Sequence, residues 1–325
     1  MSNLEADPEE LLCEQEPAPL SEVELLAPRD VPLGGPRAMT VRRTLPQRGR
    51  SLIGAWCFAD HYGPDDVAET GGMVVPPHPH TGLQTVSWLF SGEIEHRDST
   101  GAHALVKPGE LNLMTAGAGI QHSEVSTPET TTLHGVQLWV ALPESARTRE
   151  PMFERFVPEV FDHEGASVNV FLGRLLGHHS TASAFTPIVG AQFELPAHTT
   201  IRVPVEATFE HGILVDTGSV TLDGTVIPAA NIGYRAPGAA HLTISTGEAP
   251  ARMLLLGGEP FGEAIVMWWN FVGRSHEEIV ESRTTWMTEV IEGAEPGGRF
   301  GQLASTGRRA LPAPELPRGQ LRPRS

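Results

Sequence analysis

Two short motifs carry the side chains best suited to chemistry, His78-x-His80 and, later in the chain, His122-x-Glu124. In an extended strand the side chains at positions i and i+2 point to the same face. His78 and His80 can therefore face one cavity, and so can His122 and Glu124. If the two strands face each other, three imidazoles and one carboxylate converge. That set of nitrogen and oxygen donors suits a mid-to-late first-row divalent metal.

A structural explanation of these residues has to be weighed against a metal site. A lone His-x-His motif is common and often belongs to a turn or to the surface. The second motif changes the balance, because it follows a Gly-rich turn at a spacing that one β-meander spans. Buried His and Glu side chains without partners are costly, so packing alone explains four of them poorly. The residues therefore predict a metal centre.

Composition and charge restrict the class of protein. The chain has 325 residues, enough for two domains, and its 34 glycines and 28 prolines favour short strands joined by tight turns. A net charge of -17 argues against nucleic-acid binding through a basic face. No apolar run approaches the ~20 residues of a membrane span, and the acidic N-terminus does not resemble a signal peptide. Cys13 and Cys57 lack any metal-ligand spacing, so a cytoplasmic protein is the simplest expectation.

Strand-like runs and turns alternate along the chain in two successive halves. The run from Pro228 to His241 echoes the run from Pro108 to His122 and indicates an internal duplicate. The second copy has Thr243 where the first has Glu124, so we expect it to be metal-free. The expected organisation is an acidic flexible arm over 1–38, a metal-binding domain over 39–150, a metal-free domain over 151–272, a helix over 273–292 and a disordered Arg-, Pro- and Gly-rich tail over 293–325.

Four local features give further expectations. The acidic arm has an alternative as an extension docked across the other domain. The apolar run 265–272 is expected to pack between the domains. Ser275 and Glu278 form a capping box that starts the C-terminal helix. Asp60 and His61 are interpreted as residues that fix a turn, with a role beside the metal as the alternative.

Longer strings of the sequence resemble a known family. The two histidine motifs resemble the cupin signature, and DHYGP, HPHTGLQTVSWLFSGEIEHRDSTG, PGELNLMTAGAGIQHSE and GGEPFGEAIVMWWNFVGR resemble the pirin family. The resemblance covers roughly Thr40 to Val290 and is close in the first half. It implies a mainly β fold, in which two cupin-type β-barrels pack face to face and a C-terminal helix follows. Gln84 departs from the Glu that many cupins have at its position. The resemblance therefore assigns the metal ligands but not the residues that surround them.

The resemblance also implies a cofactor and ligands. Iron, as Fe(II), is expected in the first barrel, with Mn, Ni, Co, Cu or Zn as alternatives. The residues that match the family's ligand positions are His78, His80, His122 and Glu124.

Two functions remain open at this point. Pirin-like proteins include members that cleave quercetin, so a quercetin 2,3-dioxygenase reaction on a flavonol-like substrate is the leading hypothesis, with Glu124 as the catalytic general base. The alternative is a non-enzymatic regulator whose iron senses redox state and which binds a protein partner. A purely structural metal is disfavoured, because such sites usually saturate the metal and favour thiolates. We expect a monomer.

Overall fold

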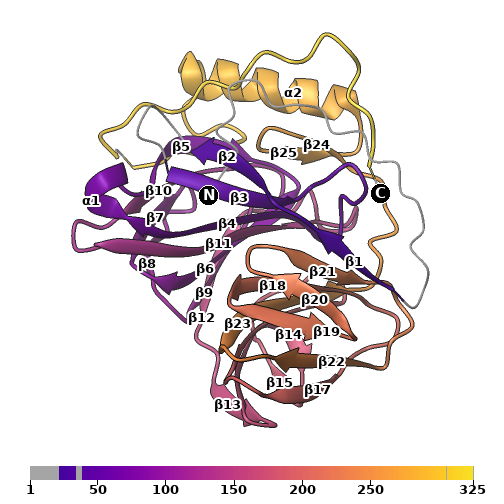
Figure 1. Ribbon diagram of the computed structural model, residues 1–325. Coiled ribbons are helices and arrows are strands. Elements are labelled where there is room, and N and C mark those ends of the chain that lie inside the picture. Colours follow the sequence, from indigo (N-terminus) through magenta and orange to yellow (C-terminus); the bar gives the residue numbers. More distant parts are fainter. Residues whose placement is uncertain (1–21, 34–38, 305, 325) are drawn as a thin grey trace.

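The computed structural model describes residues 22–33, 39–304 and 306–324. They form two β-barrels, with a helix laid across one end of the first (Figure 1). The first barrel combines a seven-stranded sheet in the order β12-β9-β6-β11-β4-β3-β2 with a four-stranded sheet in the order β5-β10-β7-β8. Its elements are β2 (Arg29–Leu33), β3 (Met39–Leu45), β4 (Trp56–Asp66), α1 (Val67–Thr70), β5 (Val74–His80), β6 (Leu83–Ser91), β7 (Ile94–Asp98), β8 (His103–Val106), β9 (Leu111–Thr115), β10 (Ile120–Ser126), β11 (Thr132–Ala141) and β12 (Met152–Phe156).

The second barrel repeats this arrangement. Its large sheet has the order β1-β21-β18-β23-β16-β14-β13, with β15 added to β14, and its small sheet has the order β17-β22-β19-β20. The two sheet orders match strand for strand, as a duplicated domain predicts. The elements are β1 (Val23–Leu26), β13 (Val160–His163), β14 (Ala166–Leu175), β15 (His178–His179), β16 (Ile188–Leu195), β17 (Thr200–Pro204), β18 (Glu210–Thr217), β19 (Ser219–Leu222), β20 (Thr225–Pro228), β21 (Ile232–Arg235), β22 (His241–Thr246) and β23 (Ala251–Gly258).

Burial along a strand follows its place in the barrel. In β17 the pattern TIRVP alternates between exposed and buried residues, because one face of the strand meets solvent. In β6 the first seven residues of LQTVSWLFS are all buried, because this strand lies inside the large sheet with protein on both faces. Polar residues of β6 therefore point into the molecule rather than to water.

The N-terminal segment over residues 22–33 contributes one strand to each barrel. Strand β1 pairs with β21 of the second barrel, and β2 pairs with β3 of the first. Arg50 holds β1 through an ion pair of 2.7 Å with Glu24. The prediction of a flexible arm is therefore wrong for residues 22–33, which form the docked extension that was the alternative. Residues 1–21 and 34–38, which the same prediction covered, lie outside the described residues. Strand β12 lies beyond the expected domain boundary at residue 150, yet it pairs with β9 of the first barrel.

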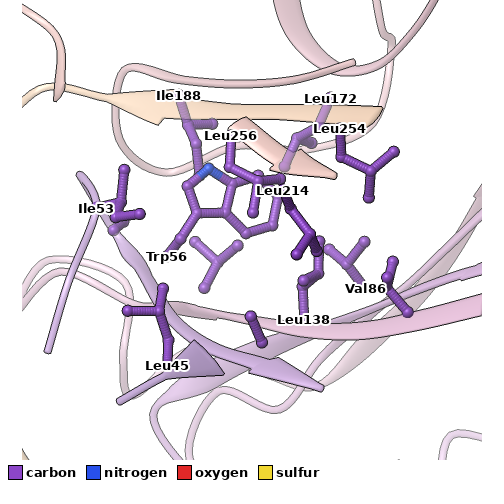
Figure 2. Packing of buried hydrophobic residues seen from close by; sticks show 14 of the residues in the cluster. Leu45, Ile53, Trp56, Val86, Leu138, Leu172, Ile188, Leu214, Leu254 and Leu256 are labelled. Atoms are coloured by element: carbon purple, nitrogen blue, oxygen red, sulfur yellow. The ribbon is translucent and has the colours of Figure 1, made fainter. Parts of the chain in front are cut away.

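One hydrophobic cluster joins the barrels, as the face-to-face prediction requires (Figure 2). Trp56 on β4 and Leu138 on β11 meet Leu214 on β18 and Leu254 on β23. The indole Nε1 of Trp56 lies within hydrogen-bond distance of two backbone carbonyl oxygens of the second barrel, 3.3 Å from Val189 and 3.2 Å from Gly257. The polar edge of this large ring is thus satisfied inside the shared core.

The C-terminal helix begins where its capping box predicts. Helix α2 (His276–Trp286) continues as the π-helical turn η1 (Met287–Ile291), and the Ser275 hydroxyl accepts a hydrogen bond from the Glu278 amide. The described residues after it are packed rather than disordered, since Phe300 and Leu321 are buried. The prediction of a disordered tail is therefore wrong for 293–304 and 306–324. None of the helices in the described part of the chain has the length and apolar character needed to cross a membrane.

The apolar run 265–272 also lies elsewhere than expected. It forms the hairpin of β24 (Val266–Trp268) and β25 (Phe271–Gly273). The hairpin packs against α2 and the first barrel (Figure 1). Phe271 forms a β-bridge with Thr81 of the first barrel. The hairpin therefore covers one end of the first barrel instead of filling the space between the two barrels.

Candidate metal centre

The two histidine motifs lie on neighbouring antiparallel strands of the small sheet. His78 on β5 stands directly opposite His122 on β10, and His80 follows two residues later on the same face of β5. A β-bulge between His122 and Glu124 shifts the register, so that Glu124 pairs with Val75. The sequence pattern therefore gives the strand faces correctly, and the bulge sets where the carboxylate lies.

The three imidazoles converge inside the barrel. One ring nitrogen from each of His78, His80 and His122 lies within 4.8 Å of the others, and all three side chains are 0% exposed. The Nε2 atoms of His80 and His122 are 3.1 Å apart. Two nitrogens bound at right angles to one metal at about 2.1 Å would be about 3.0 Å apart. The spacing of this pair therefore fits a shared metal ion.

Backbone carbonyls select the ring tautomers of two of these histidines. Nδ1 of His78 donates to the carbonyl of Pro76 at 2.8 Å, and Nδ1 of His80 donates to the carbonyl of Asn270 at 3.2 Å. A neutral imidazole has a single N–H, so these tautomers leave each Nε2 with its lone pair. Burial lowers the pKa of His78 to about 4 and lowers the pKa values of His80 and His122 well below their ordinary range. At neutral pH the rings are therefore in the uncharged form that metals bind.

Glu124 joins the site through a second, overlapping group of potential ligands. One of its carboxylate oxygens lies within 4.8 Å of ring nitrogens of His96 and His122, and the side chain is 0% exposed. Ser87 on β6 donates to Glu124 Oε1 at 3.2 Å and lies 2.9 Å from the side-chain amide of Gln137. A serine hydroxyl has one proton, so Gln137 completes this chain when its Nε2 faces Ser87. This series of hydrogen bonds from Gln137 through Ser87 holds the Glu124 carboxylate in a defined orientation.

His96 and Asp98 on β7 were missed by the sequence interpretation. Nδ1 of His96 lies 3.5 Å from Nδ1 of His122, and its Nε2 lies 2.9 Å from Oδ2 of Asp98. Carboxylates and imidazoles behind a metal-binding histidine fix its tautomer and raise its basicity. The i, i+2 spacing of His96-x-Asp98 could have indicated a shared face, but only the pairing of β7 with β10 places that face beside His122.

Asp60 and His61 do not contact this centre and do not fix a local turn. Asp60 forms a buried ion pair with Arg43, with Nε and Oδ1 2.7 Å apart. His61 lies 2.7 Å from Asp216 of the second barrel. The departure at Gln84 also has a local explanation, because its amide donates to Thr115 Oγ1 at 2.9 Å and to the carbonyl of Ser183 at 3.0 Å. The contacts of these three residues link β4 to β3, β4 to β18 and β6 to β9.

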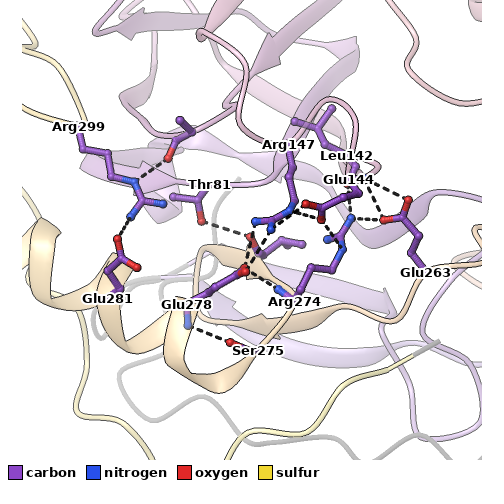
Figure 3. A network of polar contacts seen from close by, with 12 residues as sticks. Thr81, Leu142, Glu144, Arg147, Glu263, Arg274, Ser275, Glu278, Glu281 and Arg299 are labelled. Atoms are coloured by element: carbon purple, nitrogen blue, oxygen red, sulfur yellow. Dashed lines mark hydrogen bonds and ion pairs between the residues drawn. The ribbon is translucent and has the colours of Figure 1, made fainter.

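The C-terminal segment covers the end of the barrel that holds the histidines. The amide of Leu311 donates to the carbonyl of Pro77, and the side chain of Gln121 donates to the carbonyl of Gly301, both at 2.8 Å. At the start of α2, Arg147 contacts Glu278, whose carboxylate also accepts from the amide of Arg274 (Figure 3). The centre is therefore enclosed by segments that lie far apart in the sequence.

We expect the centre to keep its metal in mild acid. Protons compete for the ring nitrogens only near the folded-state pKa values, about 4 for His78, whereas an exposed histidine is half protonated near 6.5. Metal content after equilibrium dialysis between pH 7 and pH 4 checks this, and loss of half the metal near pH 6.5 would contradict it.

The stability of the fold should also depend on pH in this range. Because the pKa of His78 is lowered on folding, the unfolded chain binds more protons between pH 6.5 and pH 4 than the folded chain does. The free energy of unfolding should therefore fall as the pH falls from about 6.5 to about 4.

Comparisons with known proteins agree with this architecture. Residues 38–140 match the pirin family, and residues 190–291 match the pirin C-terminal cupin domain. A protein of Pseudomonas aeruginosa named "Putative quercetin 2,3-dioxygenase" is 38% identical over 89% of this chain and 89% of its own length. A pirin-like protein of Caulobacter vibrioides is 34% identical over 76% of this chain and 87% of its own.

A solved structure shows the same fold. The crystal structure of quercetin 2,3-dioxygenase from Acinetobacter baumannii matches with a TM-score of 0.86 at 35% identity, over 93% of this chain and 98% of that chain. The two family matches fall on the two barrels, which are cupin domains. The first barrel holds a group of His and Glu side chains able to bind a metal. The chain belongs to the pirin family.

Proposed function

We propose that this protein is an iron-dependent dioxygenase of the quercetin 2,3-dioxygenase type. The observation that carries the proposal is the convergence of three uncharged, buried imidazoles, with the Nε2 atoms of His80 and His122 3.1 Å apart. The names of the relatives at 38% and 35% identity support the substrate class, a flavonol. The residues that would hold the metal are His78, His80, His122 and Glu124.

The donor set favours a catalytic over a structural metal. Three imidazoles and one carboxylate contain no thiolate, and a six-coordinate ion would keep two positions for other molecules. Fe(II) suits these donors, and Mn, Ni, Co, Cu and Zn share the preference to differing degrees. When bound, the metal supplies Lewis-acid and redox chemistry.

The chain itself contributes proton transfer and orientation. Glu124 accepts the proton of the flavonol hydroxyl, and the hydrogen bond from Ser87 holds its Oε1 during that transfer. His96 and Asp98 fix the ring of His122 from behind. The segment after residue 265 encloses the site and restricts water around it. Both atoms of dioxygen enter the product of a dioxygenase, so the reaction needs no external reductant.

The experiment is anaerobic metal analysis followed by addition of quercetin under oxygen. We expect stoichiometric metal and metal-dependent loss of the flavonol absorbance. Glu124→Gln keeps an oxygen ligand but removes the base, so turnover should fall by about 10²–10⁴-fold. Glu69→Gln, an exposed change on α1, is the matched control and should leave turnover unchanged. Bound metal without turnover in the native protein would overturn the proposal and favour the redox regulator that binds a protein partner.

A further inference from the structure

The second barrel contains a cavity of its own. It has a volume of about 320 Å³, at the lower end of the range for small-molecule sites. It lies where the end of β14 and the start of β16 meet the turn from β17 to β18. The residues around it are mostly apolar, with two exposed charged residues and one buried imidazole; those that bear on its chemistry are Arg174, Val189, Val205, Glu206, Phe209 and His211.

The location of the cavity corresponds to that of the metal centre. The small sheets have matching orders, β5-β10-β7-β8 and β17-β22-β19-β20, so the β17–β18 segment takes the place of the β5–β6 segment. In the first barrel the end of β5 carries His78 and His80, whereas β17 has no histidine, and its last residue, Pro204, lines the cavity. The second barrel therefore keeps a cavity at this place with different chemistry.

His211 is the buried polar side chain that lines this cavity. It is 1% exposed, and neither ring nitrogen has a hydrogen-bond partner among the described residues. Buried polar atoms in native proteins are nearly always hydrogen-bonded, so such a residue lining a cavity calls for a partner there. Burial, together with the nearby Arg235, lowers the pKa of His211 to about 4. The ring is therefore neutral at pH 7, with one donor and one acceptor.

A hydroxyl group complements a neutral imidazole better than an ion does. It can donate to the unprotonated nitrogen or accept from the N–H, whereas a carboxylate can only accept and an ammonium can only donate. Val189, Val205 and Phe209 provide apolar walls for a ring. Arg174 and Glu206 carry opposite charges and are both exposed, so the rim favours neither sign of ligand charge.

We propose that this cavity binds a small uncharged phenol, with the aromatic ring against Val189, Val205 and Phe209 and the hydroxyl group hydrogen-bonded to His211. The volume suits a single ring better than a three-ring flavonol. The site is separate from the metal centre and does not depend on the dioxygenase proposal.

The test uses the full chain, loaded with zinc so that it is diamagnetic and labelled with ¹⁵N. Phenol should shift the ring-nitrogen resonances of His211 in a saturable way and leave those of His122 unchanged. Toluene, which has the ring without the hydroxyl, should enter without a hydrogen-bond shift at His211. Absence of any His211 shift with phenol, or a shift at His122 alone, would overturn the proposal without any variant.

Variants then assign the hydrogen bond. His211→Leu keeps side-chain volume and removes both nitrogens, so phenol affinity should fall about tenfold while toluene affinity stays within about twofold. His198→Leu, an exposed change in the same barrel, is the control and should change neither affinity. Unchanged phenol affinity in His211→Leu would overturn the role of His211. Equal losses for phenol and toluene would overturn it too, because they would show a damaged cavity rather than a lost hydrogen bond.

Discussion

Replacing His122 with alanine should abolish metal binding and leave both barrels folded. His122 belongs to both groups of potential ligands, so its loss separates Glu124 from His78 and His80. Loss of a residue behind a ligand typically weakens metal binding 10–100-fold, and loss of the ligand itself should exceed about 100-fold. The fold should survive, because the shared hydrophobic core rather than the metal holds the barrels together.

Metal content and circular dichroism measured on the same sample check this prediction. His103→Ala is the matched control, because His103 is half-exposed on β8 and pairs with Glu95 rather than with the centre. The control should keep both its metal and its spectrum. A native metal content in His122→Ala would exclude this residue as a ligand, and global unfolding would show that the centre is required for the fold.

Replacing Trp56 with alanine should destabilise both barrels together. Trp56 lies in the cluster that joins them (Figure 2). It is 0% exposed, and its Nε1 lies near two carbonyl oxygens of the second barrel. Truncating a buried tryptophan to alanine typically lowers the free energy of unfolding by about 3–5 kcal/mol, because apolar contacts are lost and a cavity remains. The expected result is a large fall in the midpoint of urea denaturation, with a single transition.

Trp56→Phe separates the two contributions of this side chain. It keeps most of the apolar contact and removes the N–H, so the loss should be smaller than in Trp56→Ala. Val226→Ala is the surface control, because Val226 is 60% exposed, and it should change the free energy of unfolding by less than about 0.5 kcal/mol. Separate transitions for the two barrels in Trp56→Ala would contradict the view that this cluster couples them.

Much of the candidate centre could be predicted from local spacing. His78 and His80 share a face because strand side chains alternate, and this holds whatever the strand pairs with. The bulge after His122 and the long-range contact of His80 with Asn270 could not be predicted, because they depend on how distant segments pack. The same reason explains the error at His61, whose partner Asp216 lies in the other barrel.

Local sequence is enough to predict the alternation of strands and turns in two repeated halves, the cap at Ser275 and the strand faces on which the histidines lie. Each of these follows from neighbouring residues and from the geometry of the backbone. The pairing of β1 with β21, the burial of Phe300 and the position of His96 behind His122 become visible only in the folded protein. These features depend on pairing between segments far apart in the chain, where burial of apolar surface and strand register together select one arrangement.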